Sequence, residues 1–274
     1  KPRNGDFVPN LIKQNIKRSL KRYSVAGIVP EILDLKYLFI ETNSKVYYNT
    51  NLAPSASFVS TKVQRDLTAY AESSELNKYG ARFKYSRFLK VIDSSHESVT
   101  SNITTVEMRR DLRLAVSEVA EYAIDFGNEF HVQSMNGFNI RSSPFRVLNI
   151  NTDVYLYDVP DSTAEKGQIS LFSLDEGSST PVIQRRNVGV IDYKKGRITL
   201  DPINIVSGKT KDNVDILEIS ATPESNDIIG LQDLYLQLDS SFVDMVVDEI
   251  SSGADPSGST YTVTTSYKNG NIIR

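Results

Sequence analysis

The chain has 274 residues, of which 39% are hydrophobic and 24% are charged, and it contains no Cys, no Trp and only two His residues. This composition is typical of a globular protein with a substantial core. It excludes a Cys-rich zinc site, a disulfide framework and a thiolate nucleophile. No run approaches the ~18 apolar residues of a membrane-spanning helix. The first residues, Lys1-Pro2-Arg3, contain no Met and no apolar signal segment, so we expect a segment of a longer protein.

The net charge of −3 is distributed unevenly along the chain. Residues 1–113 carry 19 Lys and Arg against 11 Asp and Glu (+8), whereas residues 114–274 carry 12 against 23 (−11). Halves of opposite sign favour attraction between copies or partners, although two differently solvated surfaces explain the same asymmetry.

The first predicted element is a helix near the N-terminus. Ile12, Ile16 and Leu20 recur every four residues, which is the pattern of one helix face, and Gly27 and Pro30 are typical of a helix end. Basic residues occupy the other faces, so the helix is a candidate for nucleic-acid binding. Because the whole chain is acidic, a solvated or partner-facing helix is the better interpretation.

Residues 32–114 predict a small sheet with helices packed on it, and we interpret residues 1–114 as an α+β domain. The aromatic and β-branched run over residues 35–48 indicates a strand with a turn or bend at Asn43-Ser44, and residues 99–114 are again extended. Helices beginning near Pro54 and spanning residues 86–95 lie between them. Their inward-facing residues are Val59, Val63, Leu67 and Tyr70 in the first and Phe88, Leu89 and Ile92 in the second.

From residue 115 onward, short alternating segments separated by turn signals predict a mostly antiparallel β domain over residues 115–240. Within it, Lys194-Lys195-Gly196 is predicted to be a three-residue loop with Gly in a left-handed conformation. The expected strands lie near residues 119–126, 153–158, 168–174, 181–185, 187–193, 197–201, 214–221, 233–238, 242–250 and 260–267.

Residues 241–274 are interpreted as a C-terminal β extension and a possible dimerisation element. Residues 251–259 indicate a flexible connection, residues 260–267 a last strand, and Asn269-Gly270 a tight turn. A strand reached in this way is easily exchanged between subunits, or it folds back on its own domain. The expected fold class is therefore α+β: an N-terminal helix and strand domain, then a mostly antiparallel β domain with a C-terminal strand arm.

No motif in the chain supports catalysis. Ser207-Gly208-Lys209-Thr210 resembles the end of a phosphate loop, but Ile203 stands where that loop needs Gly, which favours a polar turn between strands. Neither His96 nor His131 belongs to a metal-binding or nucleophile-elbow pattern. We expect no enzymatic activity, no catalytic or metal-ligating residue, no cofactor and no small-molecule substrate. Because carboxylates are plentiful, a glycan hydrolase or glycan-binding module stays open as the alternative.

Five segments carry a resemblance to a known family when they are taken in order. They resemble the C-terminal part of the baseplate wedge proteins of T-even-type contractile-tailed bacteriophages and, more distantly, the baseplate J-like family. The resemblance covers nearly the whole chain. The segments are ILDLKYLFIETNSKVYYNTN (32–51), SFVSTKVQRDLTAYAESSELNKYGARFKYSRFLKVID (57–93), YAIDFGNEF (122–130), IRSSPF (140–145) and NVGVIDYKKGRITL (187–200).

The resemblance implies a structural role in the virion, in the tail baseplate, with assembly in the host cytoplasm. Wedge proteins of this kind form homodimers and contact other baseplate wedge proteins. They link neighbouring wedges into a ring around the hub, and the ring stays intact during the dome-to-star change. Neither a nucleic-acid partner nor a membrane partner is expected.

A ring built from two-fold contacts needs self-complementary patches on each chain. The richest candidate is the segment over residues 241–247, where apolar residues exceed what one face of a sheet can bury. A strand buried on both faces within its own domain is the alternative. The predicted interface residues are Phe242, Val243, Met245, Val246 and Val247.

Overall fold

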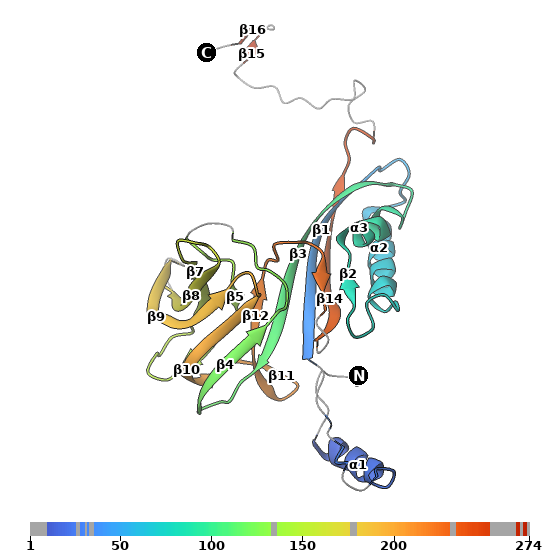
Figure 1. Cartoon of the computed structure of the whole chain (residues 1–274). Helices are drawn as coiled ribbons and strands as arrows, with labels where there is room; N and C mark the ends of the chain where they lie inside the picture. The colour runs from blue at the N-terminus through green and yellow to red at the C-terminus, as the bar shows by residue number, and fades with distance from the viewer. Residues whose placement is uncertain are drawn as a thin grey trace. The chain divides into compact units, whose positions relative to one another are not determined.

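The computed structural model describes residues 10–25, 28–30, 32, 36–132, 136–175, 180–230, 234–252, 267–268 and 271–272, and these are mostly β (Figure 1). The helices described are α1 (Asn10–Lys21), α2 (Ala56–Ala71) and α3 (Tyr85–Asp93). The longer strands are β1 (Lys36–Tyr48), β3 (Val99–Arg113), β4 (Val119–Asp125), β7 (Tyr155–Pro160), β8 (Lys166–Leu174), β9 (Pro181–Asp192), β10 (Arg197–Ser207), β12 (Val214–Ala221) and β14 (Leu234–Val247). The short strands are β2 (Arg82–Phe83), β5 (Arg141–Ser142), β6 (Arg146–Val147), β11 (Lys209–Lys211), β13 (Ile228–Ile229), β15 (Tyr267–Lys268) and β16 (Asn271–Ile272).

Two six-stranded sheets account for most of the strands. The first has the order β11-β12-β3-β1-β14, with β5 also paired to β12, and the second has the order β4-β10-β9-β8-β7, with β6 also paired to β10. The strand pairs of the second sheet are antiparallel, for example Ile198 opposite Ile191 between β10 and β9. Apart from the adjacent β11 and β12, strand neighbours in the order of the first sheet are far apart in sequence, so its assembly depends on long-range pairing.

The chain divides into two compact units, each assembled from three separate segments. Unit 1 comprises Lys1–Glu41, Ala71–Lys84 and Val106–Ser240, and unit 2 comprises Thr42–Tyr70, Tyr85–Thr105 and Ser241–Arg274. The strands β1, β3 and β14 each contribute one end to each unit. The contiguous domains expected from the sequence, 1–114, 115–240 and 241–274, stay a prediction.

Unit 2 has a core formed by the apolar stripes of its two helices. Val59, Val63 and Leu67 of α2 are fully buried, and Tyr70 meets Phe88 of α3 with ring centroids 6.4 Å apart. Each such side chain contributes roughly 1.5–3 kcal/mol by leaving water. The predicted stripe of α2 is therefore confirmed.

In unit 1 a buried carboxylate fixes the loop before β5. Asp158 on β7 is 1% exposed and accepts hydrogen bonds from the backbone N–H of Ile140 and the hydroxyl of Tyr193, both at 2.7 Å. Burial, and then the charge of Asp158, raise the pKa of Tyr193 well above its ordinary value, so the phenol remains a donor. Gly137 packs directly on the same residue: its φ is +79°, and a Cβ there would lie 1.8 Å from the Asp158 carbonyl oxygen.

The structure confirms some local predictions and corrects others. The loop at residues 194–196 is present, with Gly196 at φ +61°. The predicted turn at Asn43-Ser44 is wrong, because β1 continues through it and the buried Ser44 hydroxyl is hydrogen-bonded to that of Thr104 at 2.8 Å.

Two pairs of predicted strands merge in the structure. The segments expected at 181–185 and 187–193 form β9, and those at 233–238 and 242–250 form β14. The predicted strand over 260–267 and the turn at Asn269-Gly270 lie almost entirely outside the described residues.

Candidate functional site

The five predicted interface residues all lie on β14, the last strand in the order of the first sheet. Phe242 is 64% exposed and Val247 is 42% exposed, while Val243, Met245 and Val246 are half-buried. No residue between Ser241 and Val247 is fully buried, so apolar side chains on both faces of this segment remain accessible. We call the segment Ser241–Val247 the β14 edge.

The β14 edge has the chemical features of a strand that can pair with another chain. An edge strand presents backbone N–H and C=O groups on its outer side, and proteins usually protect such an edge with Lys, Pro or a bulge. The sequence SFVDMVV contains neither Lys nor Pro, and Asp244 is its one charged residue. Pairing with a second strand would satisfy the backbone groups and cover the apolar side chains at the same time.

A hydrogen-bonded turn anchors the end of the β14 edge within unit 2. The carboxylate of Asp248 accepts from the hydroxyl of Thr100 at 2.6 Å and from the backbone N–H of Ser251 at 3.2 Å. The amide of Asn49 donates to the Ser251 carbonyl at 2.7 Å. The bond from Thr100, followed by those from Ser251, lowers the pKa of the Asp248 carboxyl below its ordinary value.

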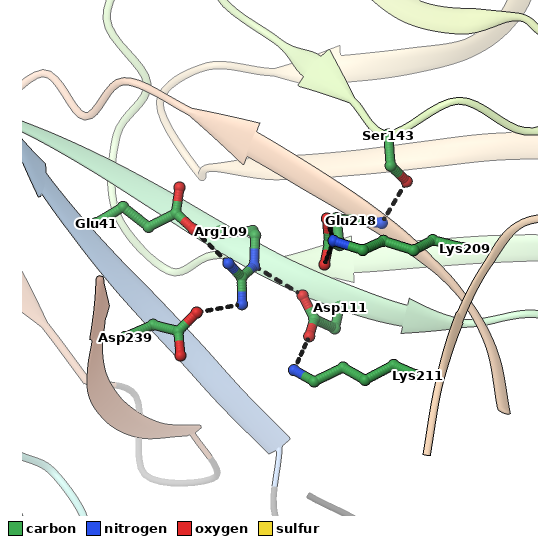
Figure 2. A network of polar contacts seen from close by, with 8 residues as sticks. All are labelled: Glu41, Arg109, Asp111, Ser143, Lys209, Lys211, Glu218 and Asp239. Atoms are coloured by element: carbon green, nitrogen blue, oxygen red, sulfur yellow. Dashed lines mark hydrogen bonds and ion pairs between the residues drawn. The ribbon is translucent and has the colours of Figure 1, made fainter. Parts of the chain in front are cut away.

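An ion network in unit 1 surrounds the guanidinium of Arg109 (Figure 2). Arg109 on β3 donates to Asp111 at 2.9 Å, to Asp239 of β14 at 2.7 Å and to Glu41 of β1. Its guanidinium carbon also lies 4.5 Å from the ring centroid of Phe39. The side chain is therefore held by three carboxylates and an aromatic face.

The carboxylates around Arg109 hold its guanidinium in the charged form. Burial lowers the pKa of Arg109, but the charges of Asp111 and Asp239 outweigh that effect and raise it above its ordinary value. Lys211 of β11 also binds Asp111, at 3.0 Å. Among the described residues, no group of three or more His, Asp or Glu side chains is placed to hold a metal ion.

The residues that the sequence offered as candidates for a phosphate loop or for catalysis form hydrogen bonds and ion pairs with nearby side chains. Lys209 follows the turn between β10 and β11 and binds Glu218 at 2.8 Å, as expected for a polar turn. His131 is hydrogen-bonded to Glu224 at 2.7 Å at an exposed position, and His96 to Ser98 at 2.8 Å. No helix in the described part of the chain is long and apolar enough to cross a membrane.

Part of this chain is similar in sequence to known proteins. Residues 36–111, from β1 to the end region of β3, match the model of a family described as baseplate structural protein gp6, C-terminal domain III. This chain is similar to a phage baseplate protein. It is 30% identical over 165 residues to the baseplate wedge protein gp6 of Enterobacteria phage T4. The aligned part is 58% of this chain and 24% of the T4 protein, so the chain spans about a quarter of that relative.

Proposed function

We propose that this chain is a structural subunit of a phage tail baseplate wedge. The observation that carries the proposal is the similarity to gp6, which combines a family match over residues 36–111 with 30% identity to the T4 wedge protein. The subunit acts through shape and contact, as part of the virion, and is assembled in the host cytoplasm. The more distant relationship to the baseplate J-like family is part of the same proposal.

In this proposal two copies pair through the β14 edge, and further contacts with other wedge proteins link the dimers into a ring around the hub. The ring stays closed while the baseplate changes from dome to star. The support is physical: the β14 edge combines accessible apolar side chains with an outer side that no other described strand pairs. Strand addition of this kind derives affinity from main-chain hydrogen bonds and specificity from alternate side chains.

Charge restricts the register of such a pair. In antiparallel two-fold pairing, an axis through Asp244 would place two carboxylates directly opposite each other, which is destabilising. An axis through Met245 instead places Asp244 opposite Val246 and Val243 opposite Val247. We therefore expect the symmetric pair to be centred at or near Met245.

The test is the oligomeric state of the purified chain by size-exclusion chromatography with light scattering. Phe242→Asp combined with Val246→Asp should convert dimers to folded monomers. Ile103→Asp is the matched control, because Ile103 is 60% exposed in unit 2 but lies on β3, which β1 separates from β14 in the strand order. It should leave the dimer intact.

Three outcomes would overturn the dimer contact. A wild-type chain that is monomeric across micromolar concentrations excludes the dimer altogether. An unchanged dimer in the double variant removes the β14 edge as the contact, and loss of the circular dichroism signal shows that these residues belong to a core. In each case the similarity to gp6 would still support a baseplate role.

A tail-associated glycan-binding module is the second candidate, because unit 1 has an aromatic cluster with an exposed ring, that of Phe138. Phe138 is 48% exposed and stacks on the buried Tyr157 with centroids 5.1 Å apart, and the ring of Phe172 contacts those of Tyr155 and Tyr157. Such faces bind sugar rings in other proteins, but Trp is absent here. Titration with cell-wall oligosaccharides decides: saturable binding that Phe172→Ala abolishes would favour this candidate over the purely structural role.

A further inference from the structure

Helix α1 has two parallel rows of side chains that take no part in the proposed contact through the β14 edge. An apolar row and a basic row each repeat every four residues, and they are offset by one residue, or about 100° around the helix. The apolar row is 43–48% exposed at each position. The rows are Ile12, Ile16 and Leu20, and Lys13, Lys17 and Lys21.

The exposure of the apolar row indicates that α1 binds something. The helix has only 12 residues, and isolated helices of about that length are marginally stable in water. An amphipathic helix is normally stabilised by packing of its apolar stripe. In α2 and α3 the corresponding residues, such as Val63 and Phe88, are fully buried.

Charge defines what can cover the apolar row. Between Asn10 and Lys21 there are four basic residues and no acidic residue. In an antiparallel pair with a second copy of α1, the two Lys rows would face each other across the apolar seam, which opposes pairing. In a parallel pair each Lys row would face Leu11, Asn15 and Ser19, and none of these side chains carries a compensating negative charge. A partner helix with Asp or Glu beside its own apolar seam would bury the apolar row and neutralise the Lys row together.

Neither the described helices of this chain nor a lipid surface fits as well. α2 and α3 already bury their stripes, and neither has an acidic row. Helices that lie in a membrane interface carry Trp, Phe or Leu on the apolar face, and the apolar row of α1 has a single Leu and neither Trp nor Phe.

We propose that α1 is a docking helix for an acidic amphipathic helix of another protein. The two helices pack along Ile12, Ile16 and Leu20, and carboxylates of the partner lie against Lys17 and its row. This contact is independent of the β14 edge, so either can hold without the other.

The probe is a labelled synthetic peptide of about three heptads, with Leu and Ile at the seam positions and Glu at the flanking positions. A matched peptide has Lys in place of each Glu. Fluorescence anisotropy with the whole chain should show saturable binding of the Glu peptide that weakens as salt rises, and no binding of the Lys peptide. Vesicles of phosphatidylglycerol are the third probe, and we expect them to bind more weakly than the Glu peptide.

Matched variants separate the two rows from general effects on the helix. Ile12→Ser with Ile16→Ser should weaken binding about tenfold or more, because two buried aliphatic contacts are lost. Leu11→Ser is the control: Leu11 is 70% exposed but lies outside the apolar row, so affinity should stay within about twofold. Lys17→Glu should weaken binding several-fold, and Arg18→Glu, on the far side of the helix, clearly less.

The proposal is overturned if the Glu peptide fails to bind, if the Lys peptide binds equally well, or if the vesicles are the only probe that binds. It is also overturned if Leu11→Ser weakens binding as much as the double variant does. The Phe242→Asp and Val246→Asp variant should bind the Glu peptide normally, which distinguishes failure of this contact from failure of the dimer.

Discussion

The Arg109 network offers the sharpest test of how unit 1 is held together. Arg109→Met removes the guanidinium and leaves Glu41, Asp111 and Asp239 close together without their common cation. Breaking a buried ion pair by removing one partner costs about 3–5 kcal/mol, and the contact with Phe39 is lost as well. Because the Arg109 side chain is only 10% exposed, water screens little of this effect.

We expect Arg109→Met to lower the free energy of unfolding by about 4 kcal/mol, which corresponds to about 10 °C in Tm for a chain of this size. Urea denaturation followed by circular dichroism measures the change, with the slope of the transition checked for two-state behaviour. Arg109→Lys keeps the charge but loses the planar fork of donors, so its cost should be intermediate, at about 2 kcal/mol.

An exposed ion pair in the same unit provides the matched control. Arg197 binds Asp125, and their side chains are 53% and 42% exposed. Arg197→Met should therefore cost less than about 1 kcal/mol. Equal costs for Arg109→Met and Arg197→Met would refute the reasoning, because burial would then have no influence on the value of the pair.

Two further perturbations test the turns. Gly137→Ala should destabilise the chain by about 3 kcal/mol or more, since the new Cβ meets the Asp158 carbonyl, whereas Gly80→Ala, also at positive φ but with nothing within 4 Å, should cost about 1 kcal/mol in the same denaturation assay. Asp248→Asn should destabilise unit 2 at neutral pH. The lowered pKa of Asp248 means that its contribution is present above the ordinary carboxyl pKa of about 3.9 and is lost as the pH falls through the folded value. The difference between wild type and variant should therefore shrink in acid, and a difference that is constant with pH would show that the charge has no role.

Local sequence patterns predicted the elements that depend only on residues close in sequence, namely single helices and hairpin loops. The stripe of Val59, Val63, Leu67 and Tyr70 has the period of a helix, and α2 buries that face. Gly196 follows Lys194-Lys195 at the point where the chain must adopt a left-handed conformation, and it does so in the loop between β9 and β10. The apolar excess of the β14 edge was also visible in the sequence, and so was the basic and apolar spacing of α1.

Tertiary structure decided the features that depend on distant segments. Glu41 and Asp239 lie 68 and 130 positions from Arg109, so no local spacing could reveal their shared cation. Asn43-Ser44 has the composition of a turn, but β1 continues through it because the buried Ser44 hydroxyl finds a partner in Thr104, 60 positions away. The β14 edge is exposed for the same reason: only the order in which distant strands pair determines which of them stands last in the sheet. Residues close in sequence determine where helices and hairpins form. Which side chains are buried or form ion pairs depends instead on which distant segments come into contact.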